Sequence, residues 1–360
     1  MLTSNWRILS PVVAFRALIL HALPCMSCGL AIGEQIRTHE DGMILVCGEA
    51  LIDLFVNSVA GGGIAAVPVA GGSPFNVAIG LARLGSTSAF LGGLSRDTFG
   101  TFLTNKLQAE GVDLAYSPRL TNPSTLVIVA LDSAGVPAYR FIGDGAADRA
   151  LTPAELPVGL PANISALTFG SLAMGVEPCG STYLALAERE KGKRVISFDP
   201  NLRASVVGDI AKWRIRQDRF VACANIVKAS LEDLEGTYGK DVQVAKVAEG
   251  WHKLGASLVI ITRGENGAAA FHANGSHCEV AGRKIKVIDT VGAGDTFHAA
   301  LINHFEATGQ LTPAKLSKLR ETEITRALNF AAAAAAVTCT RRGADMPRTA
   351  DVAAELARQA

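Results

Sequence analysis

From Met43 onward, the chain alternates between short apolar runs rich in β-branched residues and longer segments with apolar residues at three- and four-residue spacing. The short runs predict buried strands, and the wider spacing predicts amphipathic helices. One helical stripe covers 99–107 and ends before Gly111, a residue type that commonly follows a helix end. Strands that alternate with helices of this length predict βαβ units around a mainly parallel sheet, which is an α/β sandwich. Strands are expected at 44–47, 89–91, 125–131, 166–169, 195–198, 226–227 and 258–262.

Two regions interrupt this alternation. Residues 52–69 and 125–142 predict one strand after another, and Asp-Ser-Ala-Gly at 132–135 predicts a hairpin turn. Antiparallel strands of this kind have no place in a parallel sheet with helices between its strands. We therefore expect them to form a small separate sheet that serves as a lid.

The first 42 residues do not continue either pattern. Arg16, His21 and Pro24 interrupt the apolar stretch 9–32, whereas a membrane span needs ~20 uninterrupted apolar residues. A signal peptide is an alternative, but no clear small-residue cleavage site follows the stretch. The sequence therefore predicts an extension at 1–42 outside the fold, and one domain with its lid at 43–360.

Charge and cysteine content limit the classes of partner. Thirty-four basic and thirty-three acidic residues leave a net charge of +1, so no global field attracts nucleic acid or an anionic membrane. Seven cysteines are scattered with little regular spacing, which predicts free thiols in a reducing compartment, the cytoplasm. Cys25 and Cys28 form a C-x-x-C pair that lacks a second pair of ligands, so a metal or redox role is not expected there.

The segment 284–302 carries the strongest chemical signal. It predicts a strand that runs to Ile288, a turn of small residues, and a helix that begins near Asp295. The free N–H groups at a helix start form an anion site, and a carboxylate beside such a site suits a general base that takes a proton from an attacking hydroxyl. The alternative from this segment alone is that Asp295 only caps the helix. A dinucleotide fingerprint is disfavoured because Phe297 stands where its third glycine belongs, and the chain has no G-x-x-x-x-G-K-[ST] phosphate loop.

Two long motifs resemble the signatures of the PfkB carbohydrate kinases. The first is D-T-V-G-A-G-D-T-F-H-A-A-L-I at 289–302, and the second is A-G-G-S-P-F-N-V-A at 70–78, with Ser95 in place of a family glycine. The resemblance covers 43–360. It implies a ribokinase-like three-layer α/β sandwich with a mainly parallel central sheet and a small β-strand lid. It also implies ATP-dependent phosphorylation of a sugar hydroxyl, with Asp295 as catalytic base and an anion site at Gly292, Ala293 and Gly294.

The same resemblance implies binding residues elsewhere in the chain. A carboxylate accepts hydrogen bonds from two vicinal hydroxyls, which suits the aspartate of the G-E-A-L-I-D segment at 48–53. The sugar contacts implied are Asp53, Gly71, Gly72, Asn76 and, in the D-P-N-x-R turn at 199–203, Arg203. The nucleotide contacts implied are Asn201, Ser230, Thr262, Gly264 and Gly267.

Metal binding is implied at two places. The family's magnesium motif N-x-x-E appears as S-L-E-D at 230–233, so Asp233 holds its acidic position and a role of Glu232 stays open. Asp289 and Gly343 are implied to lie at a monovalent cation site, for K⁺. The residue that often touches adenine in the family is replaced by Ala332, so the adenine contacts are unassigned.

The acceptor sugar follows from two further segments. Residues 139–149 and 169–172 look like those of bacterial fructokinases within the family, which implies fructose as the small-molecule substrate. Kinases for 2-keto-3-deoxygluconate, ribose or nucleosides are the alternatives, and a non-catalytic sugar- or nucleotide-binding regulator is the alternative of another class. An exposed lid sheet also suggests a homodimer formed through the lid.

Overall fold

The computed structural model describes residues 42–59, 63–131, 137–202 and 207–358. Its main sheet has eight strands in the order β14-β13-β12-β11-β10-β9-β1-β4. The strands from β12 to β4 are mutually parallel, whereas β13 and β14 are antiparallel additions at one edge. The bounds are β1 Met43–Cys47, β4 Thr87–Leu91, β9 Ile164–Gly170, β10 Val195–Asp199, β11 Ile226–Ser230, β12 Leu258–Thr262, β13 Ala268–His272 and β14 His277–Val280.

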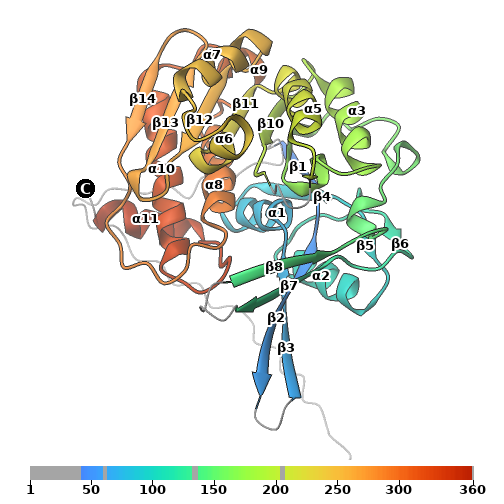
Figure 1. Ribbon diagram of the computed structural model, residues 1–360. Helices are drawn as coiled ribbons and strands as arrows, with labels where there is room; N and C mark the ends of the chain where they lie inside the picture. Colours follow the sequence, from blue (N-terminus) through green and yellow to red (C-terminus); the bar gives the residue numbers. More distant parts are fainter. Residues whose placement is uncertain (1–41, 60–62, 132–136, 203–206, 359–360) are drawn as a thin grey trace, which may run out of the picture. The chain divides into compact units, whose positions relative to one another are not determined.

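Helices cover both faces of this sheet, which gives three layers (Figure 1). Along β1, Ile44 and Val46 pack into one core cluster, while Leu45 and Cys47 pack into the other. This alternation follows from the two-residue period of a strand, and both faces are apolar because both are covered. The first cluster includes residues of α1 Ser73–Arg83, α2 Thr98–Ala109, α8 Ala293–Ala307, α10 Glu321–Cys339 and α11 Thr349–Arg358. The second includes residues of α3 Cys179–Glu190, α5 Ile210–Cys223, α6 Leu231–Tyr238 and α7 Val244–Leu254; the short helix α9 is Pro313–Leu316.

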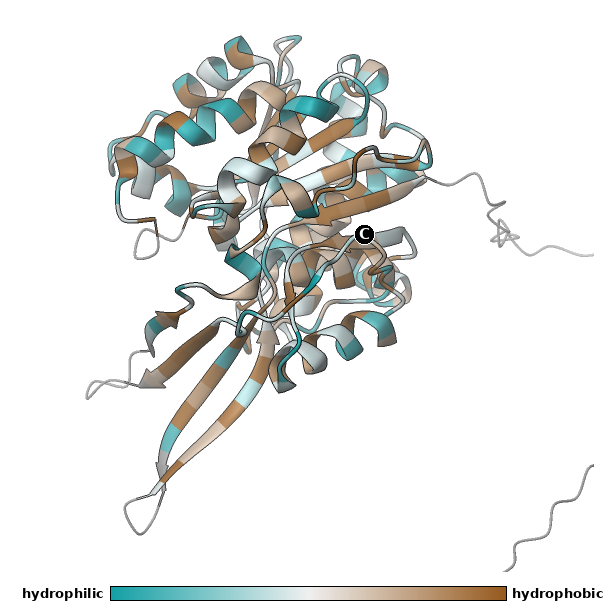
Figure 2. Cartoon of the chain, turned by 90° about the vertical axis from the view of Figure 1, so that its right-hand side faces the viewer, coloured by the Kyte–Doolittle hydropathy of each residue, from teal (hydrophilic) through white to brown (hydrophobic). Residues whose placement is uncertain are grey.

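A second sheet of four strands, in the order β3-β2-β7-β8, projects from the main body (Figure 1). It consists of two antiparallel hairpins, β2 Leu51–Val59 with β3 Gly63–Gly71 and β7 Leu126–Leu131 with β8 Pro137–Ile142, joined by a parallel β2–β7 pair. Many residues along its strands are apolar (Figure 2). A two-stranded sheet, β5 Leu94–Ser95 and β6 Arg119–Leu120, lies elsewhere in the chain.

The predicted fold class is confirmed, with a mainly parallel main sheet and a separate small sheet. All seven predicted strands are present, although 125–131 belongs to the small sheet as β7. The predicted strand at 284–288 is wrong: the segment is irregular, Val287 and Ile288 are each 57% exposed, and the Ile288 N–H donates to the Cys339 carbonyl at 2.8 Å rather than to a neighbouring strand. Helix α8 begins at Ala293, two residues before the expected start. The predicted turn at 132–135 lies outside the described residues.

Candidate active site

The carboxyl ends of β1, β9, β10 and β11 meet at one edge of the main sheet because these strands are parallel neighbours. In open α/β sheets this edge is the usual place for a ligand site. Polar residues stand at or just beyond the strand ends there, including Glu49 after β1, Ser171 after β9, Asp199 at the end of β10 and Ser230 at the end of β11.

The first turn of α8 carries the predicted base. Gly292 is the N-cap residue with φ 78°, in the left-handed region that favours glycine, and Asp295 is the third residue of the helix. Asp295 is therefore not the helix cap, which removes the alternative that the sequence left open. The unbonded N–H groups and the positive dipole end of this turn favour an anion. A buried cation adds to this, because a Cβ at Gly294 would lie only 3.3 Å from the Lys228 Nζ.

Two side chains of α1 hold the Asp295 carboxylate. The Ser73 hydroxyl donates to Asp295 Oδ1 at 2.6 Å, and the Asn76 Nδ2 donates to Asp295 Oδ2 at 2.8 Å. Asn76 was predicted as a sugar contact, and here its amide nitrogen contacts the base. Ser73 was not singled out from the sequence at all. Helices that are more than 200 residues apart in the chain thus meet at one carboxylate.

Asp53 lies on β2 of the lid sheet, next to the glycine pair. A Cβ at Gly71 would collide with the Asp53 carboxylate, and a Cβ at Gly72, where φ is 105°, would lie 2.8 Å from the Glu49 carbonyl oxygen. Close packing therefore requires both glycines even before any substrate is considered. Their contact with a sugar remains a prediction.

Two buried carboxyl groups that the sequence did not single out lie under this region. Burial raises the pKa of Glu49 to about 7, although the Ala173 N–H donates to it at 3.2 Å. Burial also raises the pKa of Asp148 to about 6, although the Thr125 hydroxyl donates to it at 2.6 Å. Ser171, beside Glu49, has φ 68° and ψ −161°, a region that is nearly restricted to glycine and is often found at functional sites.

A buried ion pair lies behind α8. Lys228 Nζ donates to Asp199 Oδ2 at 2.8 Å, and both side chains are at most 4% exposed. Burial alone would lower the pKa of Lys228, but the neighbouring Asp199, Asp233 and Asp295 raise it, so the ammonium stays charged. Burial raises the pKa of Asp199 to about 6, and the carboxylate is ionised at neutral pH. Neither the D-P-N-x-R motif nor the helix after Asp295 predicts the Lys228–Asp199 ion pair.

The predicted nucleotide residues lie around the end of β12. Thr262 ends that strand, and Gly264 and Gly267 have φ 57° and 81° in the turn before β13. A groove of about 670 Å³ lies beside this turn, between Glu265 and Asn266 on one side and the segment 282–287 on the other. The groove is lined by four basic side chains, those of Arg283, Lys284, Lys286 and Arg358. Their charge suits the binding of a polyphosphate. Asn201 has a left-handed φ of 39°, whereas Arg203 lies outside the described residues.

The predicted metal residues make contacts of their own. Ser230 and Asp233 form a capping box at the start of α6, and Asp233 also accepts from the Leu202 N–H at 2.8 Å. Asp289 Oδ2 accepts from the Gly343 N–H at 2.8 Å, so these two predicted cation residues lie together. The described part of the chain contains no cluster of three or more His, Cys, Asp or Glu side chains that could hold a metal.

Comparison with known proteins agrees with this geometry. A family model described as pfkB family carbohydrate kinase matches residues 41–350. A fructokinase of Rhizobium leguminosarum bv. trifolii is 39% identical over 279 residues, which are 78% of this chain and 84% of that protein. A structure of Xylella fastidiosa fructokinase with bound ATP has a TM-score of 0.81 at 26% identity, with 89% of this chain and 99% of that chain covered. A double mutant of Vibrio cholerae fructokinase with bound fructose, ADP and potassium ion has a TM-score of 0.75 at 28% identity, with 89% and 100% covered.

The fold and the family match thus define a sugar-phosphorylating enzyme. More specifically, the chain belongs to the pfkB family of carbohydrate kinases. None of the helices in the described ranges is long and apolar enough to cross a membrane.

Proposed function

We propose that this protein transfers the γ-phosphoryl group of ATP to fructose and forms fructose 6-phosphate. The observation that carries the proposal is the Asp295 carboxylate, which two side chains of α1 hold in the first turn of α8. The named relatives support fructose, because the fructokinases are similar to this chain over most of its length.

In the proposed mechanism, Asp295 takes the proton from the attacking sugar hydroxyl as the oxygen approaches phosphorus. The Gly292, Ala293 and Gly294 turn and the dipole of α8 stabilise the charge on the phosphoryl oxygens, and Lys228 adds a fixed positive charge behind that turn. A bound magnesium ion would neutralise phosphate charge, and Asp233 is the carboxylate assigned to it.

The sugar side of the site is assigned to the lid and α1. Asp53, the Asn76 side-chain carbonyl and the backbone of Gly71 and Gly72 would orient the sugar hydroxyls, and the predicted contact of Arg203 lies outside the described residues. Closure of the lid would exclude water and so limit hydrolysis of ATP. The nucleotide side is assigned to Asn201, Ser230, Thr262, Gly264 and Gly267.

The exposed apolar side chains Val287, Ile288 and Val291 offer an adenine base a surface next to the basic groove. Asp289 and the Gly343 loop are the assigned place for a monovalent cation, which the potassium ion in the Vibrio relative supports. The absence of a membrane-spanning helix among the described residues and the free cysteines 47, 179, 223, 278 and 339 support a cytoplasmic location.

We also propose that two copies pair through their lids. Five large apolar side chains on this small sheet expose 42–73% of their surface, namely Phe55, Ile64, Val67, Tyr139 and Ile142. Exposed apolar surface that is gathered in one place is typical of an interface with another protein chain. Light scattering should give a dimer mass that Ile64→Lys reduces to the monomer. A monomeric wild-type protein at micromolar concentration would contradict this assembly.

The substrate is tested by the ratio kcat/KM for fructose, ribose, 2-keto-3-deoxygluconate and adenosine, with ATP as donor. Fructose should have the highest value. If another acceptor exceeds fructose tenfold, a difference of about 1.4 kcal/mol in transition-state binding, the assignment to fructose is wrong. If no acceptor is phosphorylated, the protein is a binding regulator and the catalytic proposal fails as a whole.

A further inference from the structure

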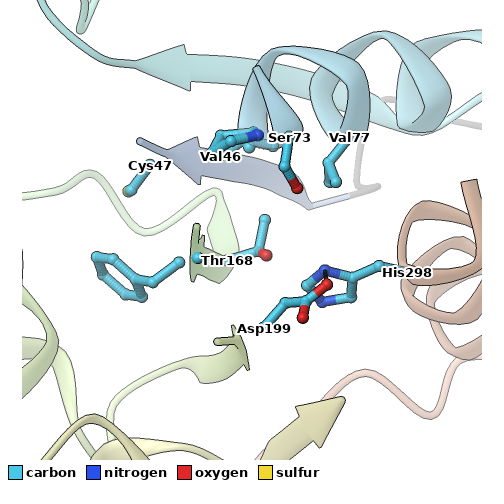
Figure 3. Close-up of a pocket in the computed structure, with 10 residues that line it drawn as sticks. Val46, Cys47, Ser73, Val77, Thr168, Asp199 and His298 are labelled. Carbon is cyan, nitrogen blue, oxygen red and sulfur yellow. Dashed lines mark ion pairs between the residues drawn. The ribbon is translucent and has the colours of Figure 1, made fainter. Parts of the chain in front are cut away.

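A small cavity lies between the start of α1, the ends of β1, β9 and β10, and α8, and one of its lining residues, Ser73, bonds to the proposed base. Its volume is about 10 Å³, which is the lower limit of the room that one water molecule needs. Four polar side chains line it, those of Ser73, Thr168, Asp199 and His298 (Figure 3). All of these except the half-buried Ser73 are at most 3% exposed, so the cavity is shielded from bulk solvent on every side but that of α1.

The two oxygens of Asp199 have different surroundings. Oδ2 accepts a hydrogen bond from Lys228 Nζ at 2.8 Å. Oδ1 is buried and has no hydrogen-bond partner among the residues that the structure describes. A buried carboxylate oxygen without a partner is costly, and ordered water commonly satisfies such an atom. The cavity provides the room for that water.

Ser73 connects the cavity to the base. Its hydroxyl has one proton, which it donates to Asp295 Oδ1 at 2.6 Å. The lone pairs of the same oxygen are then available to a donor, and the side chain points into the space above Asp199 and His298 (Figure 3).

We propose that the cavity binds one water molecule that donates to both Asp199 Oδ1 and Ser73 Oγ, and that Ser73 is thereby a positioning residue for the base Asp295. The direction of every bond follows from the chemistry of the groups. A carboxylate can only accept, so the water must donate one proton to Asp199. The second water proton is then donated to Ser73 Oγ. The Ser73 hydroxyl proton therefore points towards Asp295.

The Thr168 hydroxyl can donate to a lone pair of the water, and His298 can donate to another in the tautomer that carries its proton on Nδ1 and accepts from the Ser197 hydroxyl at Nε2. The His298 Nε2 is paired with the Ser197 hydroxyl at 2.7 Å, and its Nδ1 lies 3.8 Å from Asp199 Oδ2. Burial lowers the pKa of His298 to about 3, so the ring is neutral and carries a single N–H. With these neighbours the water has up to four polar partners, the number that buried waters commonly have.

The consequence is a chain of hydrogen bonds that links the Lys228–Asp199 ion pair to the base, in which the water donates to both Asp199 and Ser73, and Ser73 donates to Asp295. It keeps the Asp295 carboxylate in one orientation as the sugar hydroxyl approaches, and small losses of orientation reduce the rate of transfer strongly. This inference rests on Asp295 being the base, as proposed above.

The water itself is tested by a high-resolution crystal structure of the wild-type protein. Density for one water within hydrogen-bond distance of both Asp199 Oδ1 and Ser73 Oγ is expected. An empty cavity, or a water that contacts Asp199 but not Ser73, would overturn the proposal. This readout does not depend on which sugar is the substrate, or on whether the protein phosphorylates one.

The positioning role is tested by Ser73→Ala, with Ser73→Thr as the conservative variant. Ser73→Ala should lower kcat about tenfold and leave the KM values for ATP and fructose within twofold, and Ser73→Thr should recover most of the loss. Ser181→Ala is the matched control, because Ser181 also lies in the first turn of a helix and donates to a carboxylate, that of Glu177, at 2.8 Å. Its kcat should not change.

A double-mutant cycle shows whether Ser73 acts through Asp295. In an Asp295→Asn background, Ser73→Ala should cost no further activity, because the group that it orients has lost its function. A tenfold loss that persists in that background would mean a general structural role. An active wild type together with a fully active Ser73→Ala variant would overturn this inference alone, whereas a wild type that phosphorylates no sugar would overturn the proposed function.

Discussion

Glu49 belongs to a family motif, but the motif does not predict that its side chain is buried or that its pKa is raised. It lies four residues before the predicted site residue Asp53 in the G-E-A-L-I-D segment, and the sequence offers no sign that it is 1% exposed. The pKa of about 7 results from that burial. Asp295, Asn76 and Asp53 could be predicted because motifs of the family include them. The contact of Ser73 with Asp295 and of Lys228 with Asp199 could not, because no local pattern indicates which distant segments meet.

The raised pKa of Glu49 has a defined effect on stability. Between its ordinary pKa of 4.5 and the folded value of about 7, the folded protein holds a proton that the unfolded chain has lost. The free energy of unfolding therefore falls as the pH rises through this window, by about 3 kcal/mol from this group. Glu49→Gln removes that contribution. Asp148 and Asp199 act in the same direction and His298 in the opposite one, so the comparison must be made against wild type.

We predict that the stability difference between Glu49→Gln and wild type shifts in favour of the variant by about 3 kcal/mol between pH 5 and pH 8. Urea denaturation at the two pH values measures it. Glu188→Gln, which changes an exposed glutamate, should show no such trend. A difference for Glu49→Gln that does not vary with pH would mean that Glu49 titrates normally in the folded state.

At the scale of the element, the first turn of α8 is determined by its cap and by its neighbours. The sequence predicted the helix and its role but placed the start two residues late, because Asp295 resembles a capping residue. The structure shows that Gly292 begins the helix with φ 78°, and that a Cβ there would lie 2.7 Å from the Ala344 Cβ and 2.9 Å from its Cα. Contacts with a C-terminal loop more than 50 residues away have no signature in the local pattern.

Gly292→Ala should therefore destabilise the fold for two reasons, the left-handed φ and the collision with Ala344. We expect a loss of ~2–4 kcal/mol in the free energy of unfolding, of which ~1–2 kcal/mol comes from the φ alone. Gly111→Ala separates the two, since Gly111 has the same φ of 78° and no heavy atom within 4 Å of its added Cβ. Equal losses in the two variants would show that Ala344 can move aside without lowering the free energy of unfolding.

The irregular segment 281–288 is a second place where the local sequence pattern predicted the wrong structure. Its alternation of basic and apolar residues favours a strand, and the sequence predicted one. In the structure, Val287 and Ile288 are exposed and the backbone bonds to the end of α10 at Cys339. Alternation by itself does not produce a strand, because the backbone groups must also find a partner strand, and here the Ile288 N–H donates to the Cys339 carbonyl instead.

At the scale of the whole molecule, the α/β sandwich and the separate lid followed from the sequence because their periodicities are strong. Which helices cover which face of the main sheet could not be predicted, because strands that are buried on both faces are apolar throughout. The family model begins at residue 41, which supports the proposal that the kinase domain does not need the first 42 residues.

A chain that begins at Met43 should therefore fold and phosphorylate its sugar with the kcat and KM of the full chain. Thermal melting and the coupled kinase assay, with the full chain measured in parallel, test this. A fall of more than tenfold in kcat/KM, or a melting temperature lower by 10 °C or more, would show that the extension belongs to the kinase domain.

The most direct test of the account is Asp295→Asn. Asp295 is the third residue of α8 rather than its cap, so loss of its charge should cost at most ~1 kcal/mol of stability through the helix dipole. Asparagine cannot take the hydroxyl proton, and kcat should fall by ~10²–10⁴, while nucleotide affinity holds or rises because a negative charge beside the phosphates is gone. Asp351→Asn, in the first turn of α11, is the matched control and should keep full activity. An Asp295→Asn enzyme with more than about a tenth of the wild-type kcat would contradict the assignment of Asp295 as the base.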